Sequence, residues 1–308
     1  MTDSAALSCH DLHKHYGQHH VLQGIELAVA DNSIHGLVGL NGAGKTTTLE
    51  CILGLQPYDK GNIKVGGFPP QELNRARGKI AVVFDSPCLH PHLTVHQTLQ
   101  YAGLVGGKQQ MDIEEVQELL GITRYKNFKV KQLSLGNRRR TSIAQALINH
   151  PQFIILDEPF NGLDAGGVDD VLKLISRLNR EQGTSFLLAS HQLSYLEKIC
   201  SHMAILHQGK ICLNQDLASL LSRDHTSVAI YPQNLAQTKV VLSQIAGVSI
   251  VASDKTEAEG YLECQLHNIS SAQLNAELVG LGIAIDQFIL RKPTLENVFY
   301  QTIESEAA

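Results

Sequence analysis

The stretch GLNGAGKTT, residues 39–47, decides how this chain folds. It fits the pattern G-x-x-x-x-G-K-[ST], in which glycines let the backbone pass closely around a polyphosphate. The apolar run SIHGLVGL, residues 33–40, precedes it and a helical pattern follows, which is the context that the motif requires. A glycine-rich turn with an incidental lysine is the alternative, and this context disfavours it. The sequence therefore predicts a strand, a phosphate-binding loop and a helix.

Each residue type in this loop has an expected role in holding phosphate. Backbone N–H groups and the helix N-terminus face the phosphate oxygens. Lys45 adds positive charge at the β- and γ-phosphates, and the Thr46 hydroxyl can ligate Mg²⁺. The expected nucleotide contacts are Asn41, Gly42, Ala43, Gly44, Lys45, Thr46 and Thr47.

An apolar run that ends in two acids, FIILDEP at residues 153–159, supplies the second half of such a site. Asp157 at the strand end can hold Mg²⁺ through water, and Glu158 is placed to activate an attacking water. Alone, this pattern also fits an ordinary junction between a strand and a turn. Beside a phosphate loop it indicates Mg²⁺-dependent hydrolysis.

Three continuous apolar runs predict an α/β core. They are KIAVVFD (79–85), PQFIILDEP (151–159) and GTSFLLASH (183–191), as expected of strands buried on both faces of a mostly parallel sheet. Two earlier segments, residues 7–17 and 24–32, each predict a short strand bounded by turn formers. Between residues 86 and 150 apolar residues recur at spacings of three and four, which predicts a helical subdomain.

After about residue 222 the pattern becomes β, α, β, β, α, β. Such a split βαβ order predicts a small α+β domain of ferredoxin-like type. The 308 residues suit two domains at about 150 residues each, and we place them at residues 1–222 and 223–308.

Composition excludes several classes of protein. With 43% hydrophobic and 18% charged residues and no uncharged apolar run near ~18 residues, the chain is expected to be a globular protein that stays in the cytosol. The balance of 25 Lys and Arg against 30 Asp and Glu does not suit a nucleic-acid binder. The six cysteines form no C-x-x-C pair, so we expect reduced, mostly buried thiols without disulfides or zinc.

Six motifs in fixed order resemble those of the nucleotide-binding subunits of ATP-binding cassette (ABC) transporters. They are a phosphate loop, a glutamine loop, an L-S-G-G-Q signature, an acidic strand, a D-loop and a switch histidine. In this chain they are GLNGAGKTT, VVFDSPCLHPHLT (82–94), LSLGNRRR (133–140), FIILDEP, FNGLD (160–164) and LLASH (187–191). The resemblance covers residue 7 to about 222 and implies an α/β P-loop NTPase of ABC type. Its parts are a parallel sheet core, an antiparallel β subdomain and the helical subdomain, with the ferredoxin-like domain added.

The resemblance also implies roles for single residues. Ser134 and Gly136 would face the γ-phosphate of ATP held by a second subunit, so the working unit is a head-to-tail dimer around two ATP molecules. Tyr16 matches the aromatic residue that stacks on adenine, His191 the switch histidine, and Asp164 the aspartate that couples the two sites. An aromatic residue that is simply packed on a strand is the alternative for Tyr16.

The function implied is that of an ATP-hydrolysing subunit, with ATP and Mg²⁺ as cofactors and dimer closure as the driving step. Its partners would be an integral membrane permease and a second ATPase subunit, identical or different. Its place would be peripheral, at the cytoplasmic face of the inner or plasma membrane. A soluble ABC-type regulator is the alternative, but such relatives generally carry two cassettes or a long coiled-coil insertion. A P-loop kinase or GTPase would have no use for the signature or for His191.

Several positions depart from the family pattern. Asp85 stands where the family usually has Gln, and it still offers Mg²⁺ an oxygen ligand. Leu135 replaces the first signature glycine and Asn137 replaces its glutamine, which resembles exporters of peptides, drugs or polysaccharides. The end of the chain, KPTLENVFYQTIE, also resembles exporter subunits.

Two groups of basic residues allow other interpretations. Arg138 to Arg140 follow the signature, and we expect at least two of them to be solvated or in salt bridges rather than on nucleic acid. Histidine clusters raise the possibility of zinc or copper, which we do not expect, because the first lies on antiparallel strands and a turn and the second around the glutamine loop. They are His13, His15, His19 and His20, and His90, His92 and His96.

Overall fold

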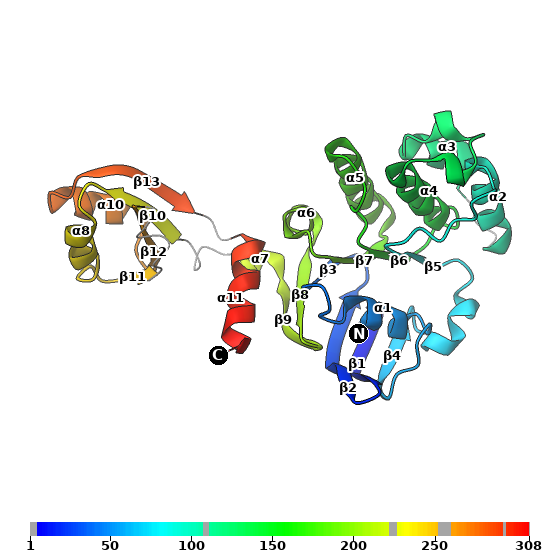
Figure 1. Ribbon diagram of the computed structural model, residues 1–308, viewed down its shortest axis with the longest axis horizontal. Helices are drawn as coiled ribbons and strands as arrows, with labels where there is room; N and C mark the ends of the chain where they lie inside the picture. Colours follow the sequence, from blue (N-terminus) through cyan, green and yellow to red (C-terminus); the bar gives the residue numbers. More distant parts are fainter. Residues whose placement is uncertain (1–4, 107–110, 222–226, 252–259, 292–293, 308) are drawn as a thin grey trace. The chain divides into compact units, whose positions relative to one another are not determined.

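The computed structural model describes residues 5–106, 111–221, 227–251, 260–291 and 294–307 (Figure 1). Its contacts divide the chain into two compact units, one of Met1–Leu217 with Thr302–Ala308 and one of Ala218–Gln301. The domain boundary predicted between residues 222 and 223 lies outside the described residues.

A six-stranded sheet forms the centre of the first unit, in the order β5-β6-β7-β3-β8-β9. Its strands are β3 (Ile34–Val38), β5 (Ile80–Val83), β6 (Phe153–Asp157), β7 (Ser185–Ser190), β8 (His202–His207) and β9 (Lys210–Asp216). All neighbours are parallel except β8 and β9. Every residue of β3, β6 and β7 is buried, as the continuous apolar runs predicted.

A smaller antiparallel sheet, in the order β2-β1-β4, lies beside the central sheet (Figure 1). Its strands are β1 (Ala5–Tyr16), β2 (His19–Ala30) and β4 (Lys60–Val65). Apolar side chains of this sheet share one buried cluster with α1 (Lys45–Ile52) and the central strands. β1 and β2 form a hairpin whose pairing continues to Tyr16 and His19, on either side of a tight turn at Gly17. β2 therefore begins at His19, earlier than the predicted residue 24.

Helices α2, α3 and α4 gather on the side of the central sheet away from the β1–β2–β4 sheet (Figure 1). The predicted helical subdomain contains α2 (Val95–Val105), α3 (Ile113–Leu119), η2 (Thr123–Tyr125), η3 (Val130–Gln132) and α4 (Leu135–Leu147). Outside it are η1 (Pro70–Ala76), α5 (Ala165–Gln182) and α6 (Leu193–Ile199). This arrangement agrees with the predicted fold.

The second unit has the predicted order of strands and helices. It contains β10 (Ser227–Pro232), α8 (Leu235–Leu242), β11 (Val248–Val251), β12 (Leu262–Leu266), α10 (Ser271–Gly280) and β13 (Ile285–Arg291). The sheet order β11-β12-β10-β13, antiparallel throughout, is that of a ferredoxin-like fold. The unit has a hydrophobic core of its own, centred on Val228, Ile230, Leu262 and Leu274. The remaining helices among the described residues are α7 (Leu217–Leu220) and α11 (Leu295–Ala307).

Two further properties of the described chain bear on the predictions. None of the helices that the structure describes is long and apolar enough to cross a membrane. The six cysteines are free thiols, and four of them, Cys9, Cys51, Cys200 and Cys264, are buried.

Candidate nucleotide-binding site

The phosphate loop joins β3 to α1 and its backbone demands glycine. Gly42 and Gly44 have φ angles of +82° and +110°, a region that other residues rarely adopt. A side chain at Gly39 would lie 2.5 Å from the backbone oxygen of Leu206. The loop therefore curls into a cradle of N–H groups at the N-terminus of α1, which is a favourable position for an anion.

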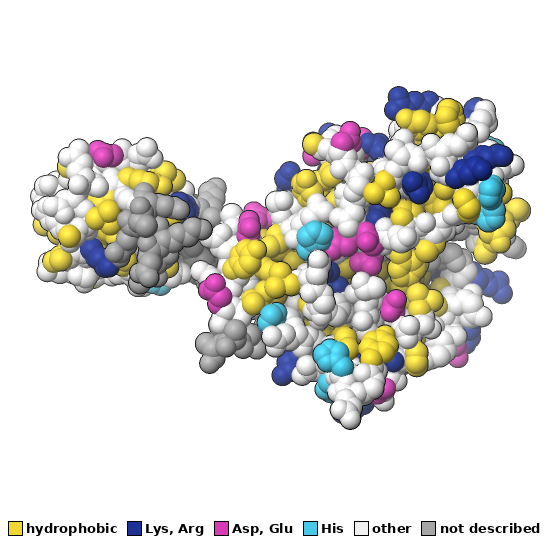
Figure 2. Space-filling view, in the orientation of Figure 1, with side chains coloured by type: hydrophobic (Ala, Val, Ile, Leu, Met, Phe, Trp, Pro, Cys, Tyr) yellow, Lys and Arg dark blue, Asp and Glu magenta, His cyan; other side chains and the backbone are white. Residues whose placement is uncertain are grey.

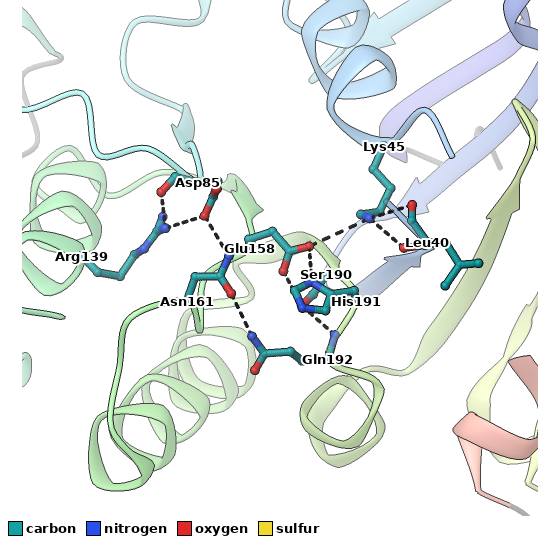
Figure 3. Close-up of polar contacts among 10 residues, drawn as sticks. Leu40, Lys45, Asp85, Arg139, Glu158, Asn161, Ser190, His191 and Gln192 are labelled. Atoms are coloured by element: carbon teal, nitrogen blue, oxygen red, sulfur yellow. Dashed lines mark hydrogen bonds and ion pairs between the residues drawn. The ribbon is translucent and has the colours of Figure 1, made fainter. Parts of the chain in front are cut away.

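The Lys45 side chain folds back onto the backbone of the phosphate loop. Its Nζ donates to the backbone oxygen of Gly39 at 2.7 Å and to that of Leu40 at 3.4 Å (Figure 3). Burial lowers the pKa of the lysine, while the charges of Glu158 and Asp157 act in the opposite direction. The ammonium group is thus held where the loop faces the acidic strand end.

Asp157 and Glu158 lie at the carboxyl end of β6, next but one to β3 in the sheet. Asp157 is only 3% exposed, and burial raises its pKa to about 6, with further contributions from the charges of Glu158 and Asp85. Glu158 takes a left-handed backbone conformation, φ +47°, that turns the chain sharply after the strand. The two carboxylates therefore enter the site from different directions.

Both oxygens of the Glu158 carboxylate have partners on the neighbouring strand end (Figure 3). Oε1 lies 2.8 Å from Nδ1 of His191, and Oε2 accepts from the Ser190 hydroxyl at 2.9 Å. Nζ of Lys45 lies 3.9 Å from Oε1. These contacts fix the carboxylate beside the phosphate loop and bring His191 against it. The role of His191 toward a γ-phosphate stays a prediction.

One cavity of about 390 Å³ brings these groups together. Most predicted phosphate and metal residues line it, and Asn161 and Val21 line it as well. The predicted residues among its walls are Asn41, Gly42, Gly44, Lys45, Thr46, Thr47, Asp85, Asp157, Glu158 and His191. Figure 2 shows acidic side chains gathered in the middle of this face of the first unit. Ala43 and Tyr16 are not on the cavity wall.

Tyr16 lies at the end of β1 and its side chain is free to meet a ligand. The residue is 46% exposed, and Nζ of Lys14 lies 4.8 Å from the centre of its ring. An aromatic ring that is nearly half exposed can stack on a base, although Lys14 lies over one of its faces. Its role toward adenine stays a prediction.

The oxygen donors on the cavity wall fit Mg²⁺. The carboxylates of Asp157 and Asp85 and the hydroxyl of Thr46 are hard oxygen ligands, and Mg²⁺ normally completes its shell with phosphate oxygens and water. Within the described ranges, no group of three or more His, Cys, Asp or Glu side chains is arranged to hold a metal by itself.

A second cavity, of about 560 Å³, contains the other predicted nucleotide contacts. Ser134 caps α4 by accepting a hydrogen bond from the Asn137 N–H at 3.3 Å, and Gly136 follows in the first turn. Asp164 caps α5 by accepting from the Gly167 N–H at 2.9 Å. Ser134, Gly136 and Asp164 line this cavity together, whereas Lys45 does not. The two sets of predicted nucleotide contacts thus lie in two separate cavities.

The arginines behind Ser134 are in ion pairs or bonded to backbone. Arg140 pairs with Asp170 at 3.2 Å and Arg139 with Asp85 at 3.1 Å, while Nε of Arg138 donates to the Leu133 oxygen. The expected salt-bridged face is confirmed. The sequence does not predict the burial of Arg139, nor the hydrogen bonds made by Asn161, Ser190 and Gln192. Nothing in the local pattern marks residues whose partners are distant in sequence.

The first histidine cluster is a packed group on the β1–β2 hairpin. Nδ1 of His13 lies 3.1 Å from Nε2 of His20, and the rings of His15 and His20 stack at 3.9 Å. Asp11 and Asp59 each accept from one of these histidines. Carboxylates and neighbouring rings therefore occupy several of the nitrogens that a metal would need.

A phosphate loop on a parallel sheet, faced by a fixed carboxylate, a lysine and a histidine, defines the protein as a P-loop nucleoside triphosphatase. The family model described as ABC transporter matches residues 22–161. The linearmycin resistance ATP-binding protein LnrL of Bacillus subtilis (strain 168) is 31% identical over 302 residues, which are 95% of this chain and 96% of that protein. The bacitracin transport ATP-binding protein BcrA of Enterococcus faecalis is 29% identical over 295 residues, or 95% and 94% of the two chains.

Solved structures agree with these relatives. An ATP-binding subunit of an ABC transporter superposes with a TM-score of 0.65 at 27% identity, covering 70% of this chain and 91% of its own. A dimeric bacterial ABC transporter cassette gives 0.62 at 25% identity, covering 68% and 98%. The chain belongs to the family of ABC transporter ATP-binding proteins, and it is an ATP hydrolase of that family.

Proposed function

We propose that this protein drives export by closing, with a second ATPase subunit, around two molecules of Mg²⁺-ATP. The separation of the two half-sites carries the proposal. Lys45 and Glu158 line one cavity, and Ser134 and Gly136 line the other. A head-to-tail partner would supply the missing half to each site.

The residues have distinct tasks in this scheme. The loop N–H groups and Lys45 bind the phosphates, and Tyr16 stacks on the adenine. Mg²⁺, held by Thr46, Asp157 and Asp85, would neutralise charge on the phosphate oxygens. Glu158, held by Ser190 and His191, accepts a proton from the attacking water. Lys45 and His191 then stabilise the charge that develops on the γ-phosphate.

A groove on the helical subdomain supports a permease partner. It is a cavity of about 380 Å³ between β5, α2 and α4, lined by Ile80, Val82, Phe84, Tyr101 and Val105 among others. Tyr101 and Val105 are exposed although apolar, which is typical of docking surfaces. We place the protein at the cytoplasmic face of the membrane, attached through this groove.

Export, rather than uptake, is supported by two observations. The signature of this chain has Leu135 in place of a glycine. Two relatives that align with this chain over nearly their whole length are named for linearmycin resistance and for bacitracin transport. The transported compound is selected by the permease, so the chain itself names no substrate.

The test measures ATP hydrolysis by the isolated chain as a function of protein concentration. Lys45→Ala and Ser134→Arg are each expected to be inactive, and a mixture of the two to recover part of the activity, because one mixed dimer contains an intact composite site. Activity of the wild type is expected to rise faster than linearly with concentration. Linear activity and no recovery on mixing would contradict sites shared between two copies.

A further inference from the structure

Arg139 of α4 is a buried charge with an unusual set of partners. It is 1% exposed, and a charge so buried is tolerated only when it is paired. The guanidinium donates to the backbone oxygen of Phe84 at 2.6 Å, to the backbone oxygen of Asp85 and to Oδ1 of Asp85 at 3.1 Å. All three acceptors belong to the chain just after β5, so Arg139 ties α4 to that point.

The same carboxylate oxygen continues the contacts toward the hydrolytic site (Figure 3). Oδ1 of Asp85 also accepts from Nδ2 of Asn161 at 2.9 Å, and Oδ1 of Asn161 accepts from Nε2 of Gln192 at 2.9 Å. These residues come from three segments that are far apart in sequence. Asp85 follows β5, Asn161 follows β6, and Gln192 follows β7.

The chain of contacts ends on the catalytic carboxylate. The Gln192 N–H donates to the Ser190 hydroxyl at 3.1 Å, and that hydroxyl donates to Oε2 of Glu158 at 2.9 Å. A continuous polar path therefore runs from the helix that begins with the signature to the group that acts on water.

We propose that Arg139 is a positioning residue for hydrolysis. It acts through Asp85 and Asn161 to fix the position of α4, the helix that begins in the signature, relative to Glu158. The proposal rests on the proposed function, because it concerns the rate of the same reaction. Its consequence is that any movement of α4 relative to the central sheet alters the geometry around Glu158 and Asp85.

A purely structural role is the competing explanation, since a buried ion pair can serve packing alone. The two explanations differ in how the effect of replacing Arg139 depends on Asp85. Oδ1 of Asp85 pairs with Arg139, and the Asp85 side chain is more than half exposed. If Arg139 acts through Asp85, its replacement has an effect only while the Asp85 carboxylate is present. If Arg139 is a packing group, its replacement damages the enzyme whatever stands at position 85.

The experiment is a double-mutant cycle of Arg139→Gln and Asp85→Asn in the full chain. Arg139→Gln is expected to lower kcat by about tenfold or more, the range found when the partner of a metal-site ligand is lost. In the Asp85→Asn background the same change is expected to alter kcat by less than about twofold, which is the signature of coupling between the two residues. Equal losses in the two backgrounds, or no loss in Arg139→Gln alone, would overturn the proposal.

A titration with Mg²⁺ gives a second readout that packing damage would not produce. Removing the guanidinium frees a carboxylate beside the cavity, so ATP binding by Arg139→Gln is expected to be half-saturated at a several-fold lower Mg²⁺ concentration. Turnover and metal affinity would then change in opposite directions, whereas general damage weakens both. An unchanged or higher Mg²⁺ requirement would count against the proposal.

Control variants separate the proposed role of Arg139 from the proposed function on which it rests. Arg139→Lys keeps the charge but not the three-way contact, and is expected to keep the wild-type Mg²⁺ requirement with partly reduced kcat. Arg138→Gln removes a side chain whose Nε donates to the Leu133 backbone oxygen, and it is expected to stay within about twofold of wild type. If the wild type binds ATP but does not hydrolyse it, the proposed function fails, and the Mg²⁺ titration still decides the role of Arg139.

Discussion

Glu158 shows how the fold holds a single side chain in place beside the phosphate loop. Its backbone takes a left-handed conformation, and its two carboxylate oxygens are held by Ser190 and His191. A carboxylate that is fixed in this way loses little freedom when it meets a water molecule, which favours its action as a base. Two predictions follow from the residues at this strand end.

Replacing Glu158 by Gln is expected to keep ATP binding and to abolish turnover. Glutamine preserves the shape and one acceptor oxygen, but it cannot take a proton, so kcat should fall by roughly 100-fold or more while ATP affinity stays within about threefold. Steady-state hydrolysis and nucleotide titration measure the two quantities. Glu181→Gln on the exposed face of α5 is the matched control, and a Glu158→Gln variant with wild-type turnover would remove Glu158 from its catalytic role.

Asp157 is expected to make the nucleotide-free protein less stable at neutral pH. Its pKa of about 6 lies above the usual value near 4, so the folded chain takes up a proton more readily than the unfolded chain between these values. The destabilisation is therefore complete above pH 6 and is relieved as the pH falls toward 4. Asp157→Asn is expected to raise the free energy of unfolding by about 1–2 kcal/mol at pH 7.5 and by roughly a third as much at pH 4.5.

Denaturant unfolding at the two pH values, without nucleotide, measures this effect. Asp169→Asn, at an exposed position of α5, is the control and is expected to change stability by less than about 0.5 kcal/mol at either pH. Loss of stability in Asp157→Asn at pH 7.5 would show that the carboxylate is favourably paired in the folded chain.

At the scale of elements, α2 combines a firm start with an exposed apolar end. Thr94 and Gln97 form a reciprocal capping box at its N-terminus, which satisfies N–H groups that a helix start leaves free. Its other end carries Tyr101, Leu104 and Val105, all exposed. A well-anchored helix with an apolar exposed end is suited to contact a partner rather than to fill the core of this chain.

Val105→Asp is expected to release the protein from membranes without affecting its chemistry. Val105 is 69% exposed and lines the groove beside α2, so a carboxylate there disfavours an apolar partner and leaves the fold intact. The membrane-bound fraction after cell fractionation should fall about tenfold or more, while ATP hydrolysis by the isolated chain stays within about twofold. Val240→Asp, at an exposed apolar position of the second unit, is the control, and equal release by both variants would argue against the groove.

At the scale of the whole molecule, the chain builds two units with separate cores. The core of the first unit joins the two sheets and α1, whereas that of the second lies between its sheet and helices α8 and α10. All residues assigned here to nucleotide binding or hydrolysis belong to the first unit. We therefore expect that the stability of the second unit can change without a change in the site.

Leu274→Ala tests this independence. Leu274 is fully buried in the core of the second unit, so its truncation is expected to lower the stability of that unit by about 2–5 kcal/mol. Calorimetry should show the loss in one transition only, and ATP affinity should stay within about twofold. Leu281→Ala, at an exposed position, should have little effect. A large loss of ATP affinity in Leu274→Ala would show that the two units are coupled.

The sequence by itself determined the features that depend on neighbouring residues. The glycine pattern of residues 39–47 sets the backbone of the phosphate loop, and continuous apolar runs specify strands buried on both faces, because both effects act over a few residues. The βαββαβ order of the second unit could be predicted in the same way. The resemblance to the ABC family then assigned Glu158, His191 and Ser134 to a nucleotide site, an assignment that stays a prediction, and the structure has the first two on one cavity wall and Ser134 on another.

Only the tertiary structure decided which distant residues meet. Arg139 pairs with Asp85, 54 positions away, and Ser190 with Glu158, 32 positions away. In the sequence, Arg139 looked like one of three equivalent arginines, and Asp85 like a free metal ligand. Their pairing depends on how α4 packs against the end of β5, and no local pattern contains that information, because the energy of a buried charge is set by what surrounds it in space.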